Sequence, residues 1–172
     1  MWLCALIGLG FAFVLPVSAK TVVAGKAARL SEPTGGFSYI PPAGWHVRTF
    51  PGMKYRISYA MPSGGFAPNI NVVDETAAVP MSRYVPMSLI QMHRMFSTFH
   101  LLSQTAFVTK SGLSGVCLRS TATVAGRNVR QVCYMFPAPS DRKLIVTASW
   151  LALDGDKYAQ AVDASMKTFA LQ

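Results

Sequence analysis

The stretch that decides the fold runs from residue 116 to residue 136 and reads VCLRSTATVAGRNVRQVCYMF. It contains two runs, 116–124 and 129–136, that are rich in β-branched and aromatic residues. The short segment Ala125-Gly126-Arg127 lies near their junction. Two such runs around a glycine-containing connection are typical of a β-hairpin. The sequence therefore predicts an antiparallel strand pair in the second half of the chain.

Two registers compete for this hairpin. A three-residue loop over 124–126, with Gly126 left-handed, would place Cys117 directly opposite Cys133. A two-residue turn at Gly126 and Arg127 would place Cys117 opposite Phe136 instead. Opposed residues in an antiparallel pair have Cα atoms about 4.5 or 5.5 Å apart, which is within the range of a disulfide. Of the two registers, the first alone allows the two cysteines to be joined.

Further runs of alternating polarity lie on both sides of the hairpin and indicate a β-rich domain. The apolar spacing changes to that of an amphipathic helix over 81–102 and again over about 156–168. Short connections favour antiparallel pairing, and two helices are needed to cover the apolar surface of the sheet. The sequence predicts an α+β fold in which two helices cover a mainly antiparallel sheet. The remaining expected strands are 37–40, 45–50, 55–61, 69–73, 104–109 and 144–151.

The first 19 residues have the pattern of a cleavable signal peptide. An uncharged apolar run ends at Pro16, and Val17-Ser18-Ala19 provides small residues before Lys20. The run is shorter than the roughly 20 residues that a membrane span needs; an uncleaved helix or anchor is the alternative. We expect cleavage after Ala19, a periplasmic or secreted protein, and no integral membrane span after cleavage. Residues 20–36 are then a flexible lead-in, and 37–172 are a single domain.

Cleavage would remove Cys4 and leave Cys117 and Cys133 as an even pair. An even pair of cysteines in an exported chain favours a disulfide. An oxidising compartment therefore favours the first hairpin register. The sequence predicts a Cys117–Cys133 disulfide with a structural role.

The chain is strongly basic. Sixteen Lys and Arg against seven Asp and Glu give a formal net charge of +9, which predicts attraction to an anionic partner. Export disfavours nucleic acid and favours an envelope protein or an anionic envelope surface. The cations are scattered along the sequence, so general solubility is the competing interpretation. The interaction surface that we expect consists of Arg119, Arg127, Arg130, Arg142 and Lys143.

The sequence carries no recognisable catalytic motif. His93 and His100 lie seven residues apart in the expected helix, a rise of about 10.5 Å, which is too far for them to share one metal ion. Most acidic residues fall in expected turns and helix starts, where capping accounts for them. The chain has neither a Gly-x-Ser-x-Gly elbow nor a phosphate-binding loop. We expect no enzymatic activity, no metal and no cofactor.

Three stretches share the pattern of one superfamily. The segment 37–45 reads FSYIPPAGW, with Gly44 in a turn and Trp45 filling the core beneath it; 69–72 reads NINV and begins with Asn69. The third stretch combines 144–149 with 163–169. In this order they resemble the PsbP-like superfamily, which includes PsbP, the Ran-binding Mog protein and DcrB-type bacterial envelope proteins. The resemblance covers 37–171 and implies an α/β/α sandwich that binds other macromolecules or supports their assembly.

The leading hypothesis is an exported, non-enzymatic accessory or binding protein of the cell envelope. A small-ligand or ion-binding module that uses the cleft of the sandwich is the first alternative. The second alternative is a hydrolase with an unrecognised site, which would need His46 or His93 beside a serine and a carboxylate. The aromatic residues that could line a ligand pocket are Trp45, Tyr55, Tyr59 and Trp150.

Overall fold

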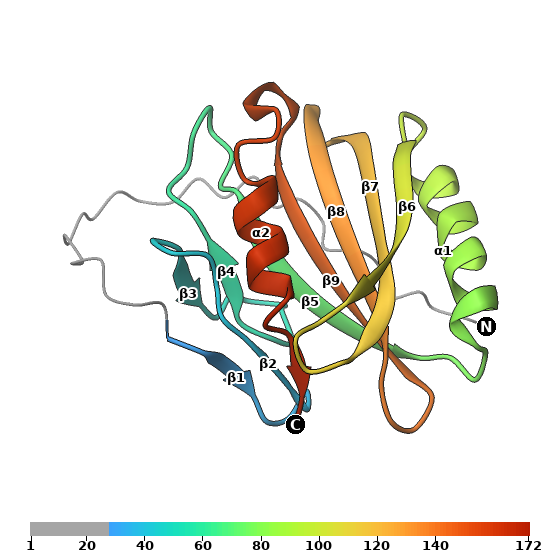
Figure 1. Ribbon diagram of the computed structural model, residues 1–172. Helices are drawn as coiled ribbons and strands as arrows, with labels where there is room; N and C mark the ends of the chain where they lie inside the picture. The colour runs from blue at the N-terminus through green and yellow to red at the C-terminus, as the bar shows by residue number, and fades with distance from the viewer. Residues whose placement is uncertain (1–27) are drawn as a thin grey trace.

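The computed structural model describes residues 28–172 (Figure 1). The expected signal peptide, 1–19, and residues 20–27 of the expected lead-in lie outside the described residues. The elements follow in the order β1 (Leu30–Glu32), β2 (Phe37–Tyr39), β3 (His46–Arg48), β4 (Ile57–Tyr59), β5 (Asn69–Thr76), α1 (Met81–Met95), β6 (His100–Val108), β7 (Ser114–Val124), β8 (Arg127–Pro137), β9 (Arg142–Leu151), the 3-10 turn η1 (Ala152–Asp154), α2 (Ala159–Met166) and β10 (Ala170–Leu171).

A seven-stranded sheet forms the body of the molecule. Its strand order is β3-β4-β5-β9-β8-β7-β6, and every neighbouring pair is antiparallel. Successive side chains of a strand point to opposite faces. On β9, Val146 belongs to the same buried cluster as Met166 of α2, whereas Ile145 belongs to that of Met92 of α1. The two helices therefore cover opposite faces, α2 lying on the face turned to the viewer in Figure 1. The predicted α+β fold with α/β/α layers is confirmed.

The last part of the expected lead-in is a strand, so the prediction of a flexible segment is wrong there. β1 pairs with β2, and β2 pairs with β10, which makes a second, three-stranded antiparallel sheet. Leu30 joins the main buried cluster, and Glu32 accepts a hydrogen bond from Nε of Arg56 at 2.9 Å. The segment is short and polar, so its sequence pattern gave no sign of a strand. The burial of Leu30 and the hydrogen bond of Glu32 to Arg56 hold it in place.

The helix expected over 81–102 ends at Met95. Phe96 has extended dihedral angles, and His100 already pairs with Thr121 as the first residue of β6. Phe99 fits the apolar spacing because its side chain reaches the same buried cluster as α1, although it does so from the connection after the helix. The periodic pattern therefore continued beyond the true end of the helix.

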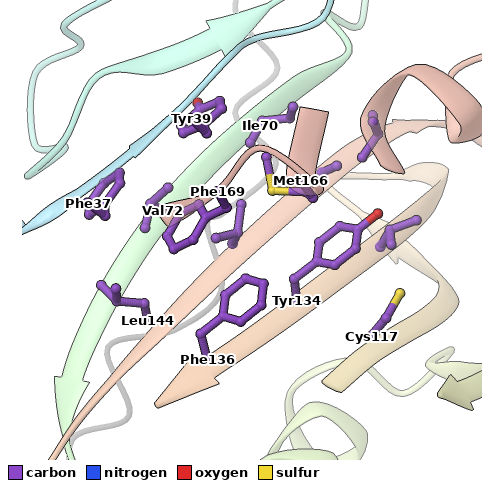
Figure 2. Close-up of a cluster of buried hydrophobic side chains, with 14 of the residues drawn as sticks. Phe37, Tyr39, Ile70, Val72, Cys117, Tyr134, Phe136, Leu144, Met166 and Phe169 are labelled. Carbon is purple, nitrogen blue, oxygen red and sulfur yellow. The ribbon is translucent and has the colours of Figure 1, made fainter. Parts of the chain in front are cut away.

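The larger core lies between the sheet and α2, and Figure 2 shows its centre. The ring of Phe169, which follows α2, stacks on Phe136 of β8 with centroids 5.0 Å apart. It also stacks on Phe37 of β2 with centroids 5.5 Å apart. Aromatic side chains of this size contribute much of the energy of a core. The stack joins the small sheet, the large sheet and the C-terminal segment in one buried unit.

The hairpin adopts neither of the two expected registers. β7 and β8 pair with Val124 opposite Arg127, so Ala125 and Gly126 alone form the turn. Their φ angles are both positive, 48° and 74°, as a two-residue type I′ turn requires. Cys117 consequently faces Tyr134 and not Cys133.

This register overturns the predicted disulfide. A slip of one residue sends a side chain to the other face of a sheet. Cys117 therefore lies in the buried cluster on the α2 side, and Cys133 lies in the cluster on the α1 side. Both cysteines are free and buried. Apolar burial sets the pairing, because Leu118 has to face α1 while Val132 has to face α2.

Candidate functional site

The cations of the expected interaction surface do not come together, and two of them are held by acids of the α2 segment. Arg119 of β7 donates to Oδ2 of Asp163 in α2 at 2.6 Å. Arg130 of β8 forms an ion pair with Asp156 in the loop before α2. These two arginines share the α2 side of the sheet, and their positive charges are balanced there.

The other three cations of that set are dispersed. Arg142 lies 3.7 Å from Asp74. Lys143 is buried and donates to two backbone carbonyl groups, at 2.8 and 3.2 Å. Arg127 donates to the carbonyl of Gly64 at 2.6 Å. Arg127 begins β8 whereas Lys143 faces the last residue of that strand, so these cations lie at opposite ends of the sheet.

A polar cluster of Arg119, Asp163 and Tyr134 ties α2 to the sheet. Asp163 accepts hydrogen bonds from the guanidinium of Arg119 and from the hydroxyl of Tyr134. Burial, followed by the hydrogen bond to Asp163, raises the pKa of Tyr134 far above its ordinary value. Burial also raises the pKa of the Cys117 thiol on the same face to about 11. Burial therefore favours the protonated forms of both side chains, and the Tyr134 hydroxyl donates its proton in the hydrogen bond to Asp163.

The histidines lie against aromatic rings. His46 is 5.5 Å from the ring of Tyr59, and His93 is 4.8 Å from that of Phe99. His100 is on β6 and not on the helix of His93, so the helical spacing that we used for this pair does not apply. Within residues 28–172, no group of three His, Cys, Asp or Glu side chains is placed to hold a metal ion.

The residues of the family-like opening motif occupy a turn and a half-buried position. Gly44 has a φ of 77°, and the amide of Trp45 donates to the carbonyl of Pro42 at 3.1 Å. The positive φ favours glycine in this turn. Trp45 packs edge-on against Tyr158 before α2, with ring centroids 6.2 Å apart. Gly44 and Trp45 thus connect the start of the large sheet to the α2 side of the core.

A row of polar side chains crosses the α1 side of the sheet, where apolar residues would be expected. Ser120, Gln131, Ser149 and Asn69 stand opposite one another in turn on β7, β8, β9 and β5. Gln131 donates to the hydroxyl of Ser149 at 3.3 Å. Asn69 donates to the carbonyl of Ala67 at 2.9 Å, which closes the loop before β5. We define these four residues, with the adjacent Asn71 and Thr147, as the polar row.

The most deeply buried part of the polar row is poorly supplied with hydrogen-bond partners. Asn71 and Thr147 face each other across β5 and β9, and they are only 3% and 1% exposed. Oδ1 of Asn71 has no hydrogen-bond partner, whereas Oγ1 of Thr147 has only the thiol of Cys133, which stands opposite it on β8. A buried polar atom without a partner is costly and calls for an explanation. The sequence motif that begins at Asn69 pointed to this strand but gave no sign of the row.

The outer side of α1 carries cations that no acid balances. Arg83 and Arg94 are exposed on this helix, and no ion pair within residues 28–172 includes a residue of α1 or β6. Met87 and Ile90 lie between the two arginines and are 50% and 52% exposed. Neither helix in the described part of the chain is both long and apolar enough to cross a membrane.

The strand order and the helix on each face of the sheet define an α/β/α sandwich. No protein-family model matches the sequence, and no curated protein matches it significantly. Solved structures nevertheless share the fold. The cyanobacterial PsbP protein CyanoP of Synechocystis sp. PCC 6803 aligns with a TM-score of 0.57 and 13% identity, over 91% of this chain and 99% of CyanoP.

Two further structures support the same assignment of the fold. LpqN of Mycobacterium tuberculosis, which is involved in cell envelope biogenesis, aligns with a TM-score of 0.58 and 14% identity, over 86% of each chain. PA94 of Pseudomonas aeruginosa, a protein of unknown function, aligns with a TM-score of 0.60 and 15% identity, over 74% of this chain and 97% of PA94. At this level of identity the likeness establishes the PsbP-like fold.

Proposed function

We propose that this chain is an exported, non-enzymatic accessory protein of the cell envelope that binds an anionic envelope component through the α1 side. The signal-like segment over 1–19 supports export. The PsbP-like fold, shared with an envelope-biogenesis protein and with CyanoP, supports an accessory role.

The observation that carries the proposal is the placement of unbalanced positive charge. The acids of the ion pairs are Glu32, Asp74, Asp156 and Asp163, and they hold cations of the core strands and of the segment after β3. Arg83 and Arg94 of α1 take no part in these ion pairs, and neither do Arg48 and Lys157. The α1 arginines differ from those two cations because they flank the exposed apolar side chains of Met87 and Ile90 on one helix. Uncompensated cations gathered on one side of a molecule attract anionic partners and raise the rate of encounter with them.

The test compares two variants of equal net charge in their binding to envelope fractions. The first is Arg83→Glu/Arg94→Glu on α1. The control is Arg48→Glu/Lys157→Glu, which reverses two exposed cations on β3 and before α2. The proposal predicts that wild type and control co-sediment with envelope fractions and that the α1 variant remains in the supernatant. Equal binding by the two variants would contradict it.

The hairpin cations are the competing location for the same function. Arg127→Glu/Arg130→Glu reverses two of them and retains the α1 arginines. We expect this variant to bind like wild type, because Arg130 is already paired with Asp156 and Arg127 with a backbone carbonyl. Loss of envelope binding in this variant alone would move the interaction surface to the hairpin.

The partnerless Oδ1 of Asn71 in the polar row favours a second function, the binding of a small uncharged ligand. Asn71 and Thr147 offer an amide and a hydroxyl to neutral hydrogen-bonding groups, and the row contains no charged residue. Native mass spectrometry of protein recovered from the envelope tests this function. A bound small molecule in wild type that is lost in Asn71→Leu/Thr147→Val would support it. A ligand-free mass in both proteins would reject the ligand-binding function. A buried water would then be the remaining hydrogen-bond partner for these side chains.

A further inference from the structure

We infer that the outer stripe of α1, defined as Arg83, Met87, Ile90 and Arg94, docks on the surface of an anionic lipid bilayer. This inference rests on the proposed function and names the partner at the same surface. It assigns the binding to lipid headgroups and the adjoining acyl region, not to an acidic protein.

The spacing of the stripe places its four side chains on one side of the helix. The intervals are four, three and four residues, which align side chains along one helical face. The eleven-residue span corresponds to about 16 Å along the helix axis. Val85 and Met92, which are buried on the sheet, lie on another side of α1. The stripe is therefore an apolar centre with a cation at each end, and it is turned away from the core.

Met87 and Ile90, the two central side chains of the stripe, are unusually exposed for large apolar residues of this helix. Met87 and Ile90 each expose about half of their surface, 50% and 52%, on a helix whose other large apolar residues mostly pack inward. Met95, at the end of α1, exposes 37%. Exposed apolar side chains that gather next to cations mark interaction surfaces, whereas scattered single ones are ordinary.

The part of the chain that contains α1 is poor in acids. One acid, Glu75, contacts the helix, where it accepts a hydrogen bond from the hydroxyl of Tyr84. No Asp or Glu occurs between Glu75 and Asp141, and this interval contains α1, β6, β7 and all of β8. A protein partner would require pairs of charges at fixed positions, whereas an anionic bilayer presents negative charge over a broad plane. The lack of acids over this interval suits a broad anionic plane.

The size of the stripe also favours a bilayer. A stable protein interface buries about 800 Å² on each partner around well-packed aromatic or arginine anchors. The stripe offers two aliphatic side chains and two flexible arginines. A bilayer interface accepts such side chains directly, since the apolar groups enter the acyl boundary while the guanidinium groups remain among the headgroups.

The test measures binding to protein-free vesicles by the chain beginning at Lys20. One set of vesicles contains phosphatidylcholine with phosphatidylglycerol as roughly one third of the lipid, and the other contains phosphatidylcholine alone. We expect binding to the anionic vesicles alone, and weakening of that binding as salt is raised, because salt screens exposed charges. Equal binding to both vesicle types would contradict the electrostatic half of the inference.

Two pairs of variants locate the surface. Arg83→Glu/Arg94→Glu should bind the anionic vesicles at least about 30-fold more weakly, since each cation near such a surface contributes a factor of about five. Met87→Ser/Ile90→Ser should lose roughly tenfold through reduced apolar insertion. The matched controls are Arg48→Glu/Lys157→Glu and Met61→Ser/Leu153→Ser. The latter removes apolar side chains that are 63% and 96% exposed elsewhere on the molecule.

The outcomes separate this inference from the proposed function. Binding to native envelope membranes without binding to protein-free anionic vesicles would overturn the lipid assignment and preserve the accessory function with a protein partner. Binding to neither would overturn both. Weakening by the Met61→Ser/Leu153→Ser control, with no effect of the α1 variants, would overturn the stripe. Circular dichroism of every variant establishes that the fold is retained.

Discussion

Cys117 and Cys133 lie on neighbouring strands but on opposite faces of the central sheet. The residue opposite Cys117 is Tyr134, which directly follows Cys133 in the sequence. Cys133 in turn faces Leu118. A disulfide between them would require both side chains on one face. That arrangement would turn Val132 and Tyr134, or Leu118, out of their clusters. The apolar contacts on both faces outweigh the roughly 3 kcal/mol that a disulfide of this loop length could contribute.

The first prediction concerns these thiols. Intact mass spectrometry of the chain beginning at Lys20, treated with an alkylating reagent but no reductant, should show no modification in the folded protein. In denaturant it should show modification of both cysteines, because they are free and buried. A requirement for reductant before alkylation in denaturant would contradict the register.

The second prediction tests the turn. Ala125 has a φ of 48°, and a left-handed conformation costs an L-residue about 1–2 kcal/mol that glycine avoids. Ala125→Gly should therefore raise the free energy of unfolding by up to about 1 kcal/mol in urea titrations. The matched control Ala106→Gly, on strand β6, should lower it by roughly 0.5–1 kcal/mol. Destabilisation by Ala125→Gly would favour the three-residue loop.

The third prediction concerns pH. Burial raises the pKa of Cys117 from 9.0 to about 11 and that of Cys133 from 9.0 to about 12. The folded protein holds these protons more tightly than the unfolded chain, so each thiol lowers the free energy of unfolding as pH rises above about 9. The stability of wild type relative to Cys117→Ala/Cys133→Ala should therefore decrease between pH 9 and pH 11. A constant difference over that interval would show that the thiols are not buried.

The fourth prediction concerns the aromatic stack. Phe169 is fully buried between Phe37 and Phe136. Phe169→Ala should lower the free energy of unfolding by about 3–5 kcal/mol, which combines lost burial with a cavity. Leu153→Ala, at a residue that is 96% exposed, should change it by less than about 0.5 kcal/mol. Similar effects of the two substitutions in urea titrations would argue against this core.

Most of the fold could be predicted from local patterns. Alternating polarity located the long strands, and the apolar stripe through Val162 and Met166 located α2. The details that failed depend on tertiary contacts. β1 is fixed by Glu32 and Leu30 reaching partners far along the chain, and the hairpin register is fixed by apolar packing on two faces at once. The positions of Cys117, Cys133 and Gly126 in the sequence were not enough to choose the register of the β7–β8 hairpin.

The candidate sites were harder to predict because they depend on what surrounds each charge. Sequence counts show that cations are in excess, but they do not show that Arg119 is balanced by Asp163 while Arg83 has no such partner. The spacing of Arg83, Met87, Ile90 and Arg94 was visible in the sequence. Its significance depended on knowing which side of α1 the sheet covers.

Photo-crosslinking in intact cells, from a photoreactive amino acid placed at Ile90 on α1, would show directly whether this helix contacts membrane lipid. Leu153, which is more exposed and lies outside the stripe, provides the reference position. Docking of the α1 stripe on lipid predicts efficient crosslinking to envelope lipid from Ile90, and loss of these adducts when Arg83 and Arg94 are also changed to Glu. Crosslinking from Leu153 with none from Ile90 would show that α1 does not face the membrane.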